Sequence, residues 1–169
     1  MWYPAATARW LVPSLALALG AGAAAAPAVA ADSVVTDVRV GQHGETTRLV
    51  FDLTRPVAFT VFSLADPYRV VLDLPEVGWR LPARALPGGV GLLKRLRYGL
   101  FKSGTSRVVL DVSGPAAIDK AFLLTPSGAR AYRLVLDLAK TTRRAFLRQS
   151  KGPGVRVRTA QAAPSKVCL

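Results

Sequence analysis

The sequence predicts an all-β fold, a sandwich of two similar short-stranded sheets built from an internal duplication. Three observations lead to this expectation. A six-residue pattern, Arg–apolar–Val–apolar–Asp–apolar, occurs four times, starting at Arg48, Arg69, Arg107 and Arg133. The surroundings also match, since 38–41 (Val-Arg-Val-Gly) corresponds to 96–99 (Leu-Arg-Tyr-Gly). No segment shows a helical period, so short strands in two similar halves are expected.

Each copy of the pattern has the composition of a β-strand, because it is short, rich in branched residues and bounded by Pro, Gly, Asp or Thr. Successive side chains in a strand point to opposite faces, so Leu49, Phe51 and Leu53 share one face in the first copy. This apolar face is expected to fill the space between the sheets. The charged residues lie on the other face, where we predict a structural role for Arg48, Asp52, Arg69, Asp73, Arg107, Asp111, Arg133 and Asp137.

The charges at the two ends of each copy predict how the strands pair. When two copies run antiparallel about their central Val, the Arg of each lies opposite the Asp of the other. We predict that the first copy pairs with the second, which places Arg48 opposite Asp73 and Asp52 opposite Arg69. Opposite charges facing each other across strands contribute roughly 0.2–1 kcal/mol per pair, and they disfavour slipped registers.

Each half of the repeat predicts four strands in the same order. Those of the first half are 34–40, 46–53, 59–63 and 68–74, and those of the second half are 93–99, 106–112, 120–124 and 131–138. Turn-forming Gly, Pro, Asp and Ser residues separate them. The segment 75–91, rich in Pro and Gly, joins the halves. Short strands in two similar blocks favour two sheets packed face to face.

Residues 1–30 have the features of a secretory signal peptide. Arg9 supplies the positive N-terminal region, an apolar run covers 11–26, and Ala-Val-Ala at 28–30 is a small-x-small cleavage site. The run contains Pro13 and Gly20 and falls short of the ~20 residues of a membrane-spanning helix, which favours cleavage over a membrane anchor. We therefore predict export from the cytoplasm, with membrane contact only through the uncleaved signal peptide.

The remaining chain is expected to form one domain followed by a tail. Residues 31–140 hold all four copies of the pattern and match the size of a single β-sandwich domain. From Lys140 onward the chain has eight Lys or Arg and no Asp or Glu. This composition predicts that residues 141–169 are a basic, disordered tail or a truncated linker.

The segments 38–41, 47–53 and 68–75, together with their second-half equivalents, follow one another behind this signal peptide. In order and number they resemble the AMIN domain, the cell-wall-targeting module of periplasmic N-acetylmuramoyl-L-alanine amidases, over residues 34–140. The resemblance implies a symmetric pair of β-sheets that binds peptidoglycan and places an amidase at the division septum for cell-wall remodelling. Related domains occur in outer-membrane secretion and pilus proteins, so an interaction domain of such an assembly is an alternative.

The resemblance carries no catalytic residue onto this chain. The amidase family uses a separate zinc domain with His and Glu ligands, whereas this sequence has one His, His43, and two Glu, Glu45 and Glu76. A catalytic zinc site generally needs three protein ligands, and His43 with Glu45 fits a polar turn in solvent better. We predict no catalytic residue, no metal, no cofactor and no enzyme activity for the chain on its own. An amidase by ancestry, active only with a catalytic domain supplied elsewhere, is a further alternative.

The formal net charge of +13 calls for an anionic partner. Nucleic acid is disfavoured by the export signal and by a tail without aromatic stacking platforms, so we predict peptidoglycan, with divisome or envelope proteins as further candidates. Arg binds carboxylates bidentately. The predicted contacts are the duplication-related Arg39 and Arg97, with Lys94, Arg95, Tyr98 and Lys102 near the second. The alternative is that these are solvated edge charges that discourage aggregation between strands.

Overall fold

The computed structural model describes residues 33–84, 86–126, 131–158 and 160–161 of the 169-residue chain. The predicted signal peptide, residues 1–30, lies outside the described residues, as does the end of the predicted tail from residue 162. In the described part, no helix combines the length and the apolar character needed to cross a membrane.

The described residues form eleven strands and one helix, and the eight strands predicted from the sequence are all among them. Their order is β1 (Val34–His43), β2 (Thr46–Leu53), β3 (Phe59–Leu64), β4 (Arg69–Pro75), β5 (Gly78–Trp79), β6 (Leu93–Lys102), β7 (Thr105–Val112), β8 (Ala116–Leu124), β9 (Tyr132–Lys140), α1 (Arg143–Lys151), β10 (Val155–Val157) and β11 (Ala160–Gln161). The predicted all-β class is therefore confirmed.

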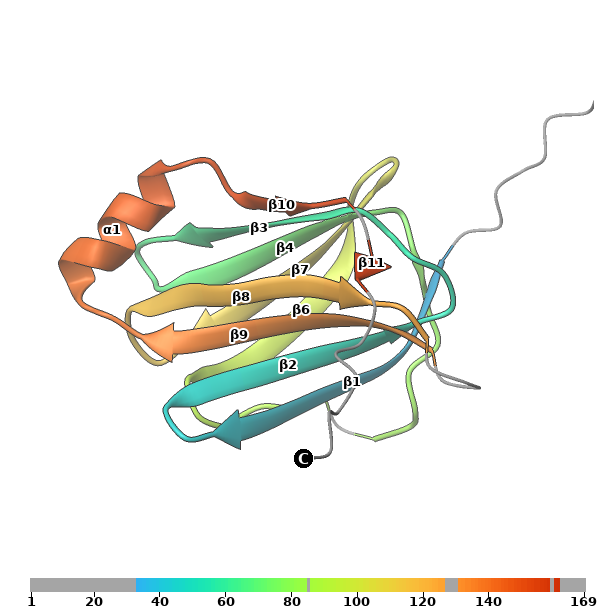
Figure 1. Cartoon of the computed structure of the whole chain (residues 1–169), viewed down its shortest axis with the longest axis horizontal. Coiled ribbons are helices and arrows are strands. Elements are labelled where there is room, and N and C mark those ends of the chain that lie inside the picture. The colour runs from blue at the N-terminus through green and yellow to red at the C-terminus, as the bar shows by residue number, and fades with distance from the viewer. Residues whose placement is uncertain (1–32, 85, 127–130, 159, 162–169) are drawn as a thin grey trace, which may run out of the picture. The chain divides into compact units, whose positions relative to one another are not determined.

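The strands form two sheets that pack face to face (Figure 1). Sheet A has the order β11-β8-β9-β2-β1-β5, and sheet B has the order β10-β3-β4-β7-β6. Every pairing between the eight longer strands is antiparallel. The short strands β5, β10 and β11 pair with β1, β3 and β8, which lie at the margins of this eight-strand framework.

The two duplicated halves are interleaved, because each contributes one pair of strands to each sheet. The first half supplies β1 and β2 to sheet A and β3 and β4 to sheet B, while the second half supplies β6 and β7 to sheet B and β8 and β9 to sheet A. Replacing β1–β4 by their equivalents β6–β9 converts the order β8-β9-β2-β1 into β3-β4-β7-β6. The eight-strand framework therefore has a two-fold repeat, and neither half can complete a sheet alone.

The predicted pairing of the first and second copies is wrong. The first copy, in β2, pairs with the fourth, in β9, and the second copy, in β4, pairs with the third, in β7. The expected register about the central Val holds, with Val50 opposite Val135 and Val71 opposite Val109. The partner comes from the other half because β2 and β4 lie in different layers, an arrangement that buries the apolar face of each against the opposite sheet.

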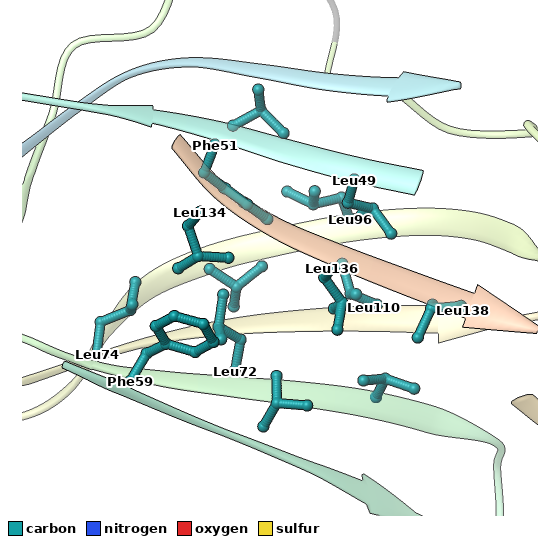
Figure 2. Close-up of a cluster of buried hydrophobic side chains, with 14 of the residues drawn as sticks. Leu49, Phe51, Phe59, Leu72, Leu74, Leu96, Leu110, Leu134, Leu136 and Leu138 are labelled. Carbon is teal, nitrogen blue, oxygen red and sulfur yellow. The ribbon is translucent and has the colours of Figure 1, made fainter. Parts of the chain in front are cut away.

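The core between the sheets comes from the apolar face that strand alternation predicts. Leu49, Phe51 and Leu53 are at most 1% exposed, and every second residue of β2 and of β7 is buried. Figure 2 shows Leu49, Phe51, Leu134, Leu136 and Leu138 of sheet A meeting Phe59, Leu72, Leu74, Leu96 and Leu110 of sheet B. Burial of each such side chain contributes about 1.5–3 kcal/mol relative to exposure. The core thus holds the two charged faces on opposite sides of the sandwich.

The expectation of an unstructured tail does not hold for residues 143–158. Helix α1 begins after Thr142, whose side-chain oxygen accepts a hydrogen bond of 3.2 Å from the backbone N–H of Ala145. Phe146 is fully buried and meets the ring of Tyr68 edge-on, with 5.0 Å between centroids. Strand β10 then pairs with β3. The sequence pattern gives little indication of a docked helix, because Phe146 is the one residue of this short helix that is buried.

Candidate functional site

On the outer face of each sheet, one Arg–Asp pair joins the two copies of the pattern. Arg48 donates from Nε and Nη2 to the two carboxylate oxygens of Asp137, both at 2.7 Å. The duplication-related Arg107 makes the same two bonds to Asp73, at 2.7 and 2.8 Å. The hydrogen bonds raise the pKa of both guanidinium groups above the ordinary value, although burial acts in the opposite direction. These bonds connect the halves of the repeat within each sheet.

The other Arg–Asp pair of each sheet lies opposite in register but shares no hydrogen bond. Asp52 faces Arg133 but accepts two bonds from Arg39, at 2.7 and 2.9 Å. Asp111, its duplication-related equivalent, faces Arg69 but accepts one bond from Arg97 at 2.8 Å and one from Arg95 at 3.1 Å. The Nε atoms of Arg69 and Arg133 are buried and have no hydrogen-bond partner among the described residues. Both arginines are thus left with unused donor capacity.

Differences between the two halves of the repeat make the two outer faces electrostatically different. Asp37 lies opposite Asp52 in sheet A, and Arg95 occupies the corresponding place opposite Asp111 in sheet B. Asp37 also forms an ion pair with Arg84 from the segment that joins the halves. Carboxylates and guanidinium groups therefore alternate on sheet A, whereas on sheet B two guanidinium groups share a single carboxylate.

The pKa values of the two equivalent carboxyl groups Asp52 and Asp111 shift in opposite directions. Burial raises the pKa of Asp52, and the negative charge of Asp37 raises it further. Together these effects outweigh the charge and hydrogen bonds of Arg39, which act to lower that pKa. Burial also acts to raise the pKa of Asp111, but the hydrogen bonds and charges of Arg97 and Arg95 outweigh it and lower that pKa.

We expect Asp52 to titrate at a higher pH than Asp111, and carboxyl carbon NMR shifts recorded against pH would measure both midpoints. A lowered folded-state pKa stabilises the fold above the unfolded value of ~3.9, and this contribution is lost as pH falls through the folded pKa. Asp111 should behave in this way. The raised pKa of Asp52 has the opposite consequence, because its stabilising contribution is lost as pH rises through the folded value. Equal midpoints would contradict the described asymmetry.

Three of the six predicted contact residues share one cavity on the outer side of sheet B, next to the turn before β4. The cavity has a volume of about 420 Å³. It is lined by Pro67, Tyr68, Arg69, Lys94, Arg95, Arg97, Asp111 and Val112. Four cationic side chains thus surround a single carboxylate. A concave surface of this charge is suited to an anionic group, because Arg and Lys present several N–H donors and no acceptor.

The structure separates the other predicted contacts from this cavity. Arg39 lies in sheet A and is bonded to Asp52. Lys102 lines a different cavity of about 580 Å³ together with Arg156, Arg158 and other residues. The sequence places four predicted contacts near Arg97, but of these only Lys94 and Arg95 lie with it in the cavity beside Arg69.

Tyr98 has an aromatic neighbour that the sequence did not indicate. Its ring centroid lies 4.1 Å from that of Trp79, with 30° between the ring planes. Trp79 belongs to β5 of sheet A and Tyr98 to β6 of sheet B, so the stack bridges the two sheets at one edge. One face of the Tyr98 ring is covered in this way, which limits the sugar-stacking role that its type suggests.

Sequence reasoning also missed residues around the outer face of sheet B. The repeat pattern predicts only a structural role for Arg69, and its place in the cavity depends on β7 bringing β4 near β6. Phe101, 53% exposed, lies against Arg107, with 3.5 Å from the guanidinium carbon to the ring centroid. Arg156 and Arg158 come from the segment expected to be a disordered tail. The sequence indicated only that the segments carrying these arginines are positively charged, and not that they contribute to cavities on sheet B.

The described residues contain no group of three or more His, Cys, Asp or Glu side chains that could hold a metal ion. His43 and Glu45 are both exposed at the turn between β1 and β2.

The family model of the AMIN domain matches residues 49–138. The chain belongs to the AMIN domain family. This match confirms the predicted resemblance. The matched segment begins in β2 and ends in β9, the paired strands that carry the first and fourth copies of the pattern.

The AMIN domain of this chain is also similar to a curated amidase. The chain is 29% identical over 114 residues to the N-acetylmuramoyl-L-alanine amidase AmiC of Escherichia coli O6:H1. The match covers 65% of this chain but only 27% of AmiC, so the chain corresponds to a minor part of that amidase.

Proposed function

We propose that this AMIN domain is a non-catalytic module that binds peptidoglycan in the periplasm and directs wall-remodelling amidase activity, as in cell division. The observation that carries the proposal is the cavity of four cationic side chains and one carboxylate on the outer face of sheet B. Membership of the AMIN family and the similarity to part of an amidase support the wall as the partner. The signal-like residues 1–30 support delivery to the periplasm.

The chemistry of the wall suits this surface. Peptidoglycan stem peptides carry free carboxylates, which Arg recognises through bidentate, charge-assisted hydrogen bonds. Arg95 and Arg97 are 69% and 49% exposed, so an incoming anion can reach both. Each contact is weak, but a polymer presents the same group many times, which raises the overall avidity of anything that carries the module.

The proposed module is larger than the segment 31–140 expected from composition. Helix α1 and β10 pack on β3, so the folded module extends at least to Arg158. Phe146 is fully buried in this added part. Cutting the chain at residue 140 would therefore remove part of the folded unit.

Co-sedimentation with purified peptidoglycan sacculi tests the proposal. The chain from residue 31 onward is expected to sediment with sacculi. The Arg95→Ala/Arg97→Ala variant is expected to lose at least about tenfold in apparent affinity, since a single hydrogen bond to a charged group contributes about 1.5–3 kcal/mol. Both side chains are about half exposed or more, so the variant should remain folded.

The matched control is Arg39→Ala on sheet A, which removes one cation that is 52% exposed and bonded to Asp52. We expect its affinity for sacculi to stay within about twofold of the unmodified chain. A chain that stays in the supernatant under all conditions would overturn the proposal. It would leave an interaction role with secretion or pilus proteins as the next candidate.

A further inference from the structure

We propose that the cavity on the outer face of sheet B is a receptor for one carboxylate group, with Arg69 as its central donor, and that the equivalent place on sheet A has lost this capacity. The inference rests on the proposed function and specifies which chemical group of the wall is recognised. It assigns to Arg69 a binding role that the repeat pattern alone does not suggest.

Arg69 has more donors than the described residues satisfy. A guanidinium has five N–H donors, and a buried donor without a partner is unfavourable. The Nε of Arg69 is buried and unpartnered among the described residues, because Asp111 opposite it is bonded to Arg97 and Arg95 instead. The Nε atom itself is closed to solvent, so an anion in the cavity would reach Arg69 through the remaining guanidinium donors that line it.

Positive charge exceeds negative charge around Arg69. The cavity lining holds Lys94, Arg95 and Arg97 besides Arg69, against the single carboxylate of Asp111. The lowered pKa of Asp111 keeps that carboxylate ionised, yet three positive charges remain uncompensated within the lining. One added carboxylate reduces this excess. It also accepts two hydrogen bonds in the geometry that a guanidinium offers.

Sheet A serves as an internal reference, because the duplication places an equivalent arginine there. Arg133 corresponds to Arg69, and its Nε is also buried without a partner among the described residues. Its surroundings differ, because Thr36 and Asp37 occupy the places of Lys94 and Arg95. Two carboxylates, Asp37 and Asp52, already neutralise the neighbouring cations there. A further anion would be repelled by them, so only the sheet B site should bind.

Titration of the chain from residue 31 onward with glutarate, followed by the Arg Nε–H signals in ¹H–¹⁵N spectra, tests the inference on the unmodified protein. We expect the Arg69 signal to shift with saturation and the Arg133 signal to stay unchanged. Inorganic phosphate is the second probe. Tighter binding of phosphate than of glutarate would contradict a carboxylate receptor and point to a phosphate-bearing polymer.

The variants Arg69→Gln and Arg133→Gln form a matched pair, because the two positions are related by the duplication and both lie opposite an Asp. We expect Arg69→Gln to raise the dissociation constant for glutarate about tenfold or more and Arg133→Gln to change it less than about twofold. Equal effects of the two substitutions, or no effect of Arg69→Gln, would overturn the inference. Should Arg69→Gln fail to fold, Lys94→Ala at an exposed position of the same lining is expected to weaken glutarate binding several-fold, and unchanged binding would count against the site.

Sacculi with amidated carboxyl groups separate this inference from the proposed function. The unmodified chain should sediment with native sacculi and remain in solution with amidated ones. Equal binding to both preparations would overturn the carboxylate receptor while leaving wall binding in place. Absence of binding to native sacculi, with an intact glutarate response at Arg69, would overturn the wall as partner and keep the carboxylate site.

Discussion

Replacing Phe146 with Ala is expected to lower the free energy of unfolding by about 3–5 kcal/mol, the usual cost of deleting a buried aromatic side chain. Phe146 is fully buried and packs edge-on against Tyr68, so its removal leaves a cavity between α1 and the sandwich. Denaturant unfolding monitored by intrinsic fluorescence and by circular dichroism would measure the loss. Phe146 is the one buried residue of α1, so the packing of the helix on the sandwich depends on this side chain and the effect should be large.

Leu147→Ala is the control for this substitution. Leu147 is the next residue of α1, is only partly buried, and lines a surface hollow with Arg143, Arg144, Arg148 and Lys151. We expect its loss of stability to be less than half that of Phe146→Ala. Similar small losses for both variants would show that α1 does not dock on the sandwich in solution, and would favour an unstructured tail beyond residue 140.

Replacing Arg48 with Ala is expected to destabilise the fold by about 3 kcal/mol, the lower end of the range observed when one partner of a buried ion pair is removed, because Asp137 is buried whereas the Arg48 side chain is 40% exposed. Asp137 is 2% exposed and receives both hydrogen bonds from Arg48. Without Arg48, the Asp137 carboxylate remains buried but loses its two hydrogen-bond donors. The cost of moving that charge out of water is then no longer offset. Urea unfolding at neutral pH would measure the effect.

The duplication supplies the control for Arg48 as well. Arg107→Ala breaks the equivalent bonds to Asp73, but Asp73 is 26% exposed and can be hydrated once its partner is gone. We expect a loss of about 1–2 kcal/mol, including the contact between Arg107 and Phe101. A larger loss for Arg107→Ala than for Arg48→Ala would contradict the role assigned to burial.

A double-mutant cycle separates the observed strand pairing from pairing of the first copy with the second. Arg48 and Asp137 should show a clear coupling energy, because they are in direct contact. Arg48 and Asp73 lie in different sheets and should show none. Coupling between Arg48 and Asp73 alone would support pairing of the first two copies and contradict the described topology.

Much of the fold followed from local pattern. Alternation of apolar and charged residues placed Leu49, Phe51 and Leu53 in the core, and the four Arg–Val–Asp copies predicted strands that pair about their central Val. The grouping of Lys94, Arg95 and Arg97 as one basic cluster was also visible, since these residues are close in sequence and lie on a single strand.

By itself, then, the sequence determined the strands, the face that each one buries and the duplication that relates them, because a period of two and a repeated motif are properties of the linear chain. It could not determine which copies pair, since all four carry Arg and Asp at the same places and any antiparallel pair satisfies their charges. Only the tertiary structure placed the halves across both sheets, docked Phe146, and brought Arg69 beside Arg95 and Arg97. These outcomes depend on burying one face of every strand at once, a requirement that no single segment expresses.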